Sequence, residues 1–239
     1  MSRNIGFIPM RGGSKRLPRK NLAELGGMKI CHRVLSAAID SECFDKIIVS
    51  TDDEEIAVYC KEFNQKIEID MRPNELGSDR ATVREVIIEF LKRDKIKNLN
   101  FETVAIMLAT CPFRSAKHIR EAYLLLDDHI DNVVGVCEYD FPWESAISIN
   151  SEQTAIFPIS PSPLIEGKTR SQDRSRFYHP NGAIYISRIA SLFKFENYFA
   201  GIMKPYVMSR SDSIDIDEEE DLEYARFLAK RRFKWKKIA

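Results

Sequence analysis

The chain has 239 residues, 44% apolar and 30% charged, a composition that excludes a disordered protein and allows one α/β domain or two small ones. Lys and Arg number 36, as do Asp and Glu, so the overall charge favours neither nucleic acid nor an anionic membrane as a partner. No apolar run reaches the ~18 residues of a membrane-spanning helix and no signal-peptide pattern opens the chain, so we expect a cytoplasmic protein. The five scattered cysteines favour free, mostly buried thiols over disulfides or a zinc site.

Short apolar runs of β-type residues alternate with segments of helical periodicity along the chain. The predicted strands are 5–8, 46–50, 104–108, 133–137, 183–186 and 206–208. The predicted helices are 30–39, 54–63, 83–91, 116–126 and 218–228. This order predicts one α/β domain over residues 1–239, a mostly parallel, doubly wound, Rossmann-like sheet with helices on both faces. Ligands bind such sheets beyond the carboxyl ends of the strands.

One stretch, residues 151–180, interrupts the alternation. It is rich in proline and polar residues and shows no helical period, and loops of that length inside a compact domain usually have a function. Its apolar residues Phe157, Ile159 and Leu164 would be exposed in a lone chain, and a second subunit would cover them. We therefore expect residues 140–187 to form a dimerisation subdomain inserted within the domain, and the protein to be a homodimer.

Directly after the first predicted strand, the segment IPMRGGSKRLPRKNL (8–22) gathers basic side chains around two glycines. Gly12 and Gly13 let the backbone N–H groups approach a ligand closely. Positive charge comes from Arg11, Lys15, Arg16, Arg19 and Lys20. A triphosphate fits this loop, although neither G-x-x-x-x-G-K-[ST] nor G-x-G-x-x-G is present, which argues against a P-loop hydrolase, a kinase or a dehydrogenase. The alternative is a solvated basic turn.

Near the other end of the chain, the segment SIDID (213–217) places two carboxylates on one face of an extended backbone. Asp215 and Asp217 suit Mg²⁺, which takes one or two protein carboxylates together with phosphate and water. The alternative is an acidic start for the following helix. The basic run AKRRFKWKK (229–237) is interpreted as a solvated helix end rather than a nucleic-acid or membrane site. Three histidines in helical patterns are not expected to act: His32, His118 and His129.

The basic loop resembles the signature of the acylneuraminate cytidylyltransferase family, whose members activate sialic acid and related nine-carbon acids, with Met10 where alanine is more usual. The resemblance continues through IIVSTDDEEIA (47–57), RPNELGSDRATV (72–83), TCPFRSAKHIREA (110–122), HPNGAIYI (179–186) and MSRSDSIDIDEEEDLEYA (208–225). It therefore spans nearly the whole chain. It implies transfer of CMP from CTP to the anomeric hydroxyl of a nonulosonic acid, with release of pyrophosphate and Mg²⁺ as the cofactor.

The resemblance also implies roles for particular residues. The nucleotide-binding set, including the loop residues, is Arg11, Gly12, Gly13, Ser14, Lys15, Lys20, Asn21, Arg72, Asp79 and Thr82. Within it Arg11, Ser14 and Lys20 match residues that hold the phosphates. Asn21 and Arg72 match residues that read the cytosine edge. The sugar-binding set is Leu108, Thr110, Arg170, His179 and Asn181, and Arg170 matches an arginine that reaches across the dimer toward the sugar carboxylate. Asp215 and Asp217 match the metal ligands and act in catalysis together with Arg11 and Lys20.

The sugar side departs from the sialic acid enzymes. Leu108 and Ala109 stand where those enzymes usually carry glutamine and proline, and LATCPF is closer to the pseudaminic acid branch. His179 replaces a frequent arginine and Glu144 falls near a frequent lysine, whereas NGAIY is of the sialic type. The sequence therefore predicts a nonulosonic acid, including the pseudaminic and legionaminic acids, without naming one. Two alternatives remain: a cytidylyltransferase for another keto-sugar acid such as Kdo, and a non-catalytic dimeric nucleotide-binding protein.

Overall fold

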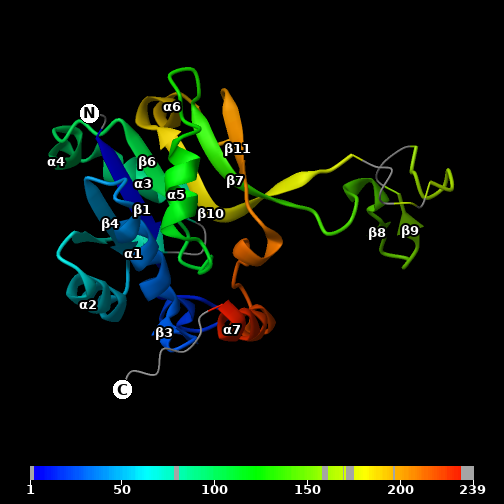
Figure 1. Cartoon of the computed structure of the whole chain (residues 1–239), viewed down its shortest axis with the longest axis horizontal. Coiled ribbons are helices and arrows are strands. Elements are labelled where there is room, and N and C mark those ends of the chain that lie inside the picture. The colour runs from blue at the N-terminus through cyan, green and yellow to red at the C-terminus, as the bar shows by residue number, and fades with distance from the viewer. Residues whose placement is uncertain are drawn as a thin grey trace.

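A computed structural model describes residues 3–77, 81–157, 161–168, 170, 175–195 and 197–232. Among these residues the central sheet has seven strands in the order β11-β7-β10-β6-β1-β4-β5 (Figure 1). Their bounds are β1 Asn4–Pro9, β4 Lys46–Thr51, β5 Ile67–Met71, β6 Thr103–Ile106, β7 Asn132–Glu138, β10 Tyr178–Arg188 and β11 Met203–Val207. All neighbours pair in parallel except β10, which runs antiparallel to β6 and β7. The predicted mostly parallel α/β sheet is confirmed.

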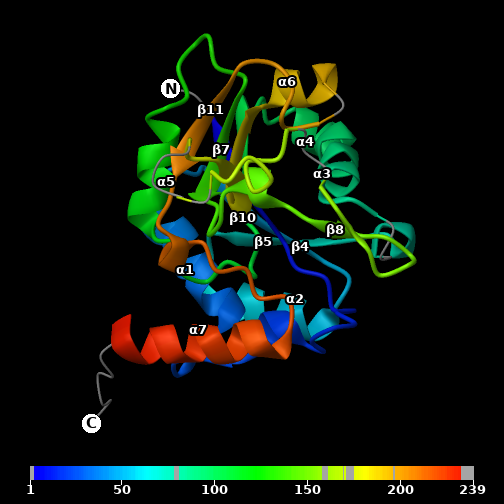
Figure 2. The same cartoon turned by 90° about the vertical axis from the view of Figure 1, so that its right-hand side faces the viewer.

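Helices cover both faces of the sheet (Figure 2). One face carries α1 (Ile30–Ser41), α2 (Glu54–Phe63) and α5 (Ala116–Tyr123), and the other carries α3 (Val83–Lys92), α4 (Asp94–Lys97) and α6 (Ile189–Lys194). The alternation of side chains along the strands divides the core between these faces. In β4, Ile47 and Val49 belong to the α1 side and Ile48 to the α3 side.

A third apolar cluster holds the two ends of the chain together. Helix α7 (Glu219–Arg232) buries Leu222, Ala225 and Ala229 against Ile216, against Leu17 of the basic loop and against Leu25 of the small hairpin β2 (Glu24–Leu25) and β3 (Met28–Lys29). Burial of apolar surface stabilises this contact. The two segments that the sequence predicts to carry the chemistry therefore lie side by side, although about 200 residues separate them.

Several elements differ from the sequence predictions. Strand β5 and helices α4 and α6 were not predicted, because each is short and shows no clear period. Helix α5 ends at Tyr123, three residues before the predicted end at position 126, so His129 lies in an exposed turn and not in a helix. Strand β11 begins at Met203, three residues before the predicted start at 206, and ends at Val207.

Between β7 and β10 the described residues of 139–177 leave the sheet and project from the body as an arm (Figure 1). The arm carries the small hairpin β8 (Ser148–Ile149) and β9 (Ala155–Ile156), and its described residues contain no α-helix. Three apolar residues of this arm were predicted to be covered by a second subunit. Phe157 and Leu164 are half-buried within the chain, and Ile159 lies outside the described residues. Others are open to solvent, with exposed fractions of 80% for Phe141 and 70% for Ile165.

All five cysteines are free thiols, and four of them are buried, as the sequence predicted. Over the described part of the chain, no helix combines the length and the apolar character needed to cross a bilayer.

Candidate active site

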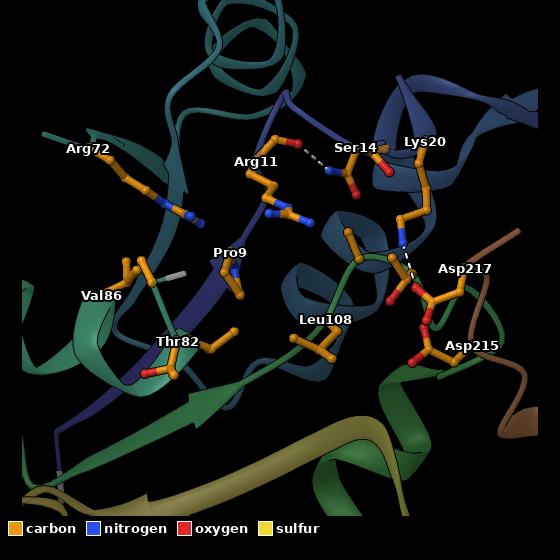
Figure 3. Close-up of a pocket in the computed structure, with 15 residues that line it drawn as sticks. Pro9, Arg11, Ser14, Lys20, Arg72, Thr82, Val86, Leu108, Asp215 and Asp217 are labelled. Carbon is orange, nitrogen blue, oxygen red and sulfur yellow. Dashed lines mark hydrogen bonds and ion pairs between the residues drawn. The ribbon is translucent and has the colours of Figure 1, made fainter. Parts of the chain in front are cut away.

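A pocket of about 510 Å³ opens at the carboxyl ends of β1, β5 and β6, where ligands bind in sheets of this kind (Figure 3). Its lining residues come from the basic loop, from the segments after β5 and β6, from the start of α3 and from SIDID. They are Pro9, Arg11, Ser14, Lys20, Asn21, Arg72, Ala81, Thr82, Val83, Val86, Leu108, Ala109, Thr110, Asp215 and Asp217. The structure thus brings together ten of the predicted site residues, drawn from distant parts of the chain.

Two arginines point into one end of the pocket. The guanidinium groups of Arg72 and Arg11 face each other across it (Figure 3). Arg72 Nε donates to Ser50 Oγ at 3.0 Å and its Nη2 donates to the Ser50 carbonyl at 2.7 Å, so β4 fixes this guanidinium. Burial lowers the pKa of Arg72, and the nearby carboxylates of Asp52 and Asp70 oppose that shift.

The basic loop is held by its own backbone as well as by its neighbours. Asn21 is only 6% exposed, and its Nδ2 donates to the Arg11 carbonyl at 3.0 Å, which leaves the amide oxygen as the side-chain atom available to a ligand. Gly12, Gly13 and Lys15 do not line the pocket. The Gly12 N–H, expected to face a phosphate, instead donates to Asp52 Oδ1 at 2.8 Å. Asp79 lies outside the described residues.

The carboxylates of Asp215 and Asp217 stand at the other end of the pocket, beside Lys20 (Figure 3). Between them Ile216 is fully buried, and its N–H donates to the Thr110 carbonyl at 2.9 Å, which anchors the segment beside β6. Lys20 Nζ lies 2.8 Å from Asp217 Oδ1, and Arg16 Nη2 lies 2.7 Å from Asp217 Oδ2. A predicted phosphate-binding lysine is therefore paired with a predicted metal ligand.

The two carboxyl groups have opposite pKa shifts. Asp215 is open to the pocket, yet the protein atoms packed around it raise its pKa, and the charge of Asp217 adds to that effect. The pKa of Asp217 is lowered; packing alone would raise it, but the hydrogen bonds and charges of Lys20 and Arg16 outweigh that effect. Asp215 thus carries a negative charge that protein cations compensate poorly, and a bound cation would relieve this.

The acidic helix start, the alternative interpretation of SIDID, is also present, but a different residue provides it. Asp221 Oδ2 accepts hydrogen bonds from the N–H groups of Asp217 and Glu218, both at 2.9 Å, and so satisfies the beginning of α7. The side chains of Asp215 and Asp217 are therefore not needed as helix caps.

The predicted sugar-binding residues do not all reach the pocket. Leu108 and Thr110 line it. Asn181 is buried with its amide committed inside the protein, because Nδ2 donates to Ser213 Oγ at 2.9 Å and Oδ1 accepts from the Ala183 N–H at 3.1 Å. His179 stacks near Tyr139 at the base of the arm, with ring centroids 4.8 Å apart. Arg170 is exposed within the arm.

An aromatic group around Tyr185, which does not line the pocket but lies near enough to Asp215 for its charge to act on the hydroxyl, was missed by the sequence analysis. Tyr185 lies near Tyr198 and Phe199, with centroid separations of 5.7 and 6.4 Å. Burial raises the pKa of Tyr185 to about 12, and the Cys111 thiol and the Asp215 carboxylate act in the same direction. The Tyr198 hydroxyl is buried and has no hydrogen-bond partner among the described residues. Tyr185 falls within HPNGAIYI, but the resemblance implies no role for it, and no motif marks the other two.

Gly182 occupies a place where a side chain does not fit. Its φ of +73° is a left-handed conformation, and an added Cβ would lie 3.1 Å from Leu108 Cδ1 and 3.2 Å from Cys111 Sγ. Gly167 has the same φ, but an added Cβ there would meet nothing within 4 Å.

These two glycines make a matched pair for a stability measurement. We expect Gly167→Ala to cost about 1 kcal/mol in the free energy of unfolding, from backbone strain alone. Gly182→Ala should cost more, by about 1–3 kcal/mol, because overpacking is added. Urea unfolding of both variants measures the difference, and equal losses would show that the wall around Gly182 yields freely.

A basic, nucleotide-sized pocket that faces two carboxylates at the carboxyl ends of a parallel sheet defines a nucleotide-binding α/β enzyme. The cytidylyltransferase family profile matches residues 5–232, and the chain belongs to this family of nucleotidyltransferases. The resemblance predicted from the motifs is thereby confirmed.

Three relatives show the range of the similarity. The N-acylneuraminate cytidylyltransferase of Streptococcus agalactiae serotype V is 34% identical over 220 residues, which cover 91% of this chain and 51% of that protein. The pseudaminic acid cytidylyltransferase of Campylobacter jejuni serotype O:2 is 28% identical and covers 95% and 97%. The CMP-N,N'-diacetyllegionaminic acid synthase of Legionella pneumophila is 29% identical and covers 92% and 93%. The chain thus spans about half the length of the streptococcal relative and nearly all of the other two.

Solved structures support the same fold. CMP:2-keto-3-deoxy-manno-octonic acid synthetase complexed with CTP superposes with a TM-score of 0.71 at 18% identity, over 97% of this chain and all of that one. The 4-diphosphocytidyl-2C-methyl-D-erythritol synthase of Anaerococcus prevotii gives a TM-score of 0.64 at 16% identity, over 95% of each chain.

Proposed function

We propose that this cytidylyltransferase transfers CMP from CTP to the anomeric hydroxyl of a nonulosonic acid and releases pyrophosphate. The observation that carries the proposal is the arrangement of the pocket, with Arg11, Arg72 and Lys20 facing the carboxylates of Asp215 and Asp217. The names of the three relatives, which act on sialic, pseudaminic and legionaminic acids, support this class of acceptor. Free thiols and a nucleotide substrate support a cytoplasmic location.

The nucleotide would lie along the basic side of the pocket. Arg72, fixed on Ser50, and the amide oxygen of Asn21 can satisfy the polar edge of cytosine, and uracil would leave some of these groups unpaired. Arg11, Ser14 and Lys20 face the space that remains for the triphosphate. Positive charge there reduces the repulsion between the two anionic substrates. It also stabilises the negative charge that develops on pyrophosphate as it leaves in the transition state.

The residues present fit Mg²⁺ as the cofactor. Asp215 and Asp217 would hold the ion, since both line the pocket, and a bound cation would offset the burial and the Asp217 charge that raise the pKa of Asp215. The described residues contain no group of three or more His, Cys, Asp or Glu able to hold a metal, so nucleotide phosphates and water would complete its coordination. Bound there, Mg²⁺ would supply positive charge for the phosphates during transfer. Lys20 pairs with Asp217 in this structure. When the ion binds Asp217 in its place, the Lys20 ammonium group would be free to contact a phosphate.

The acceptor would bind between Asp215 and the aromatic group. Leu108 gives this part of the pocket an apolar wall. Such a wall favours a substrate with an apolar substituent at that point, because a sugar hydroxyl placed against leucine would lose its hydrogen bonds.

A panel assay tests the proposed function. The protein is incubated with CTP, Mg²⁺ and single keto-sugar acids of eight or nine carbons, and pyrophosphate is measured. We expect release with at least one nonulosonic acid. Release with Kdo alone would favour the eight-carbon alternative. No release with any acid, together with CTP binding, would favour a non-catalytic nucleotide-binding protein.

We further propose that the arm forms a two-fold dimer interface. Its exposed apolar side chains include Phe141, Trp143, Ile147, Ile149, Ile156 and Ile165, and a contiguous apolar surface marks an interaction site. Glu144 Oε2 is shielded from water and has no hydrogen-bond partner among the described residues. A second copy would cover the apolar side chains and bring a basic group to Glu144, and Arg170 would reach the sugar carboxylate of the neighbouring site.

Subunit mixing tests the shared site. We expect Arg170→Ala and Asp215→Asn proteins each to be nearly inactive, and a mixture of the two to regain part of the activity, because a mixed dimer holds one intact composite site. Sedimentation first establishes a dimer at micromolar concentration, and a tag on one variant verifies exchange. A fully active monomer, or exchanged subunits without recovered activity, would contradict the shared site.

A further inference from the structure

The acidic turn TDDEE (51–55), which joins β4 to α2, packs against the basic loop at Gly12 and against the segment 72–77 at Gly77. Asp52 Oδ1 accepts the Gly12 N–H of the basic loop at 2.8 Å. Asp52 Oδ2 lies against Gly77, at the end of the short segment that begins with Arg72, where an added Cβ would be only 2.9 Å away. One carboxylate therefore touches the loop that carries Arg11 and the segment that carries Arg72.

The glycines on either side of this turn explain why the contact is close. A Cβ added at Gly12 would lie 2.5 Å from Asp53 Oδ2 and 2.7 Å from Asp53 Cβ. Neither Gly12 nor Gly77 has a positive φ, so the absence of a side chain matters here for packing and not for backbone conformation. The loop and the segment can approach the acidic turn only because both positions lack a side chain.

The negative charge of Asp52 is unfavourable beside a pocket for an anionic ligand, so its presence there calls for another role. A carboxylate beside a pocket for a triphosphate repels that ligand, so on electrostatic grounds alone its removal would tighten binding. Asp52 does not line the pocket, and its oxygens are directed at protein groups. A role in holding those groups would have to outweigh the repulsion.

We propose that Asp52 is a positioning residue for the nucleotide: its hydrogen bond to Gly12 holds the basic loop beside the base-side segment, and this link keeps Arg11 facing Arg72, which Ser50 fixes, across the pocket. The readout with CTP rests on the proposed function. The structural link itself does not.

The direction in which CTP affinity changes distinguishes two effects of removing Asp52. Loss of positioning would weaken CTP binding, whereas loss of a repelling charge would tighten it. For Asp52→Ala we expect the Kd of CTP, measured by calorimetry without acceptor, to rise about tenfold or more, since a hydrogen bond to a charged group is lost. Asp52→Asn keeps a carbonyl oxygen for the Gly12 N–H and should stay within about threefold of wild type. Binding by folded Asp52→Ala that equals or exceeds wild type would overturn the proposal.

A charge control comes from the same turn. Glu55 pairs with the exposed Arg19, and the atoms nearest to Gly12 and Gly77 belong to Asp53 and Asp52 instead. Glu55→Ala removes the same charge from the turn and should change the Kd of CTP by less than about threefold, because exposed ion pairs contribute little. A loss as large as that of Asp52→Ala would show that the effect does not depend on the contacts of Asp52 with Gly12 and Gly77, and would overturn the proposal.

Two further measurements cover loss of folding and loss of CTP binding. If Asp52→Ala does not fold, Gly77→Ala keeps the carboxylate but crowds its Oδ2, and it should also weaken CTP binding; unchanged binding would overturn the proposal.

If the wild type does not bind CTP, the proposed function fails, and amide hydrogen exchange then tests the link alone. We expect the Gly12 amide to exchange faster in the Asp52 or Gly77 variant than in wild type or Glu55→Ala. Equal protection would overturn the link.

Discussion

Asp215→Asn and Asp217→Asn should each lower kcat on the order of 10³-fold, as removal of a group that stabilises transition-state charge does. Folding should survive in both. The raised pKa of Asp215 means that the folded protein disfavours its ionised form, so a neutral Asn removes an unfavourable charge. Asp217→Asn weakens ion pairs with Lys20 and Arg16 that are partly exposed, at a cost of up to about 1 kcal/mol.

Pyrophosphate release measures the activity of these variants, and urea unfolding measures their stability. Glu220→Gln is the matched control, because this carboxylate lies exposed in the first turn of α7, a few residues from the pair, and does not line the pocket. It should retain wild-type turnover. Undiminished turnover in either Asn variant would remove the metal role from that residue.

Lys20→Ala should lower kcat/KM for CTP by about 10²–10³-fold, because a nearby opposite charge is worth about 4 kcal/mol at an effective dielectric constant near 20. The Lys20 side chain is 13% exposed and lines the pocket, so water compensates poorly for its loss. Stability should change little, since Asp217 keeps its ion pair with Arg16.

Arg16→Ala separates the two cations that pair with Asp217. Arg16 lies as close to this carboxylate as Lys20 does, but its side chain is 60% exposed and does not line the pocket. We expect only a few-fold loss of kcat/KM from Arg16→Ala, in line with the small contribution of exposed ion pairs. Equal losses in the two variants would indicate that both act through Asp217 and that neither contacts the nucleotide.

The sequence predicted the long, strongly periodic elements and missed the short ones. Helices α1, α2 and α3 begin where their patterns predict, and Asp53 and Thr82 cap two of them. Strand β5, IEIDM, has only three apolar residues among its five and reads as a loop. Strand β10 was predicted at less than half its length, because Pro180 and Gly182 signal a turn. There the pairing with β7 shifts register, which lets proline and glycine remain within the strand.

The site was predictable where residues form a motif and not where contacts cross the fold. The basic loop and SIDID were recognised, and the structure places Arg11, Ser14, Lys20, Asp215 and Asp217 around one pocket. The contact between Asp52 and Gly12 has no signature of its own, because it joins positions 40 residues apart in sequence. Asn181 shows the converse: an amide within a recognised motif makes its hydrogen bonds inside the protein.

The position of β10 in the sheet has a consequence for how the chain folds. The neighbours of β7 in the sheet are β10 and β11, so during synthesis β7 emerges before either partner exists. Pairing β7 with β10 closes the arm as one long loop. The entropic cost of closing it exceeds the cost of closing a hairpin loop a tenth as long by about 2 kcal/mol. Until that closure, the apolar strand β7 and one edge of β6 are unpaired, and association with other chains competes with folding. Completion of the sheet is therefore a late, long-range event that depends on residues beyond the arm.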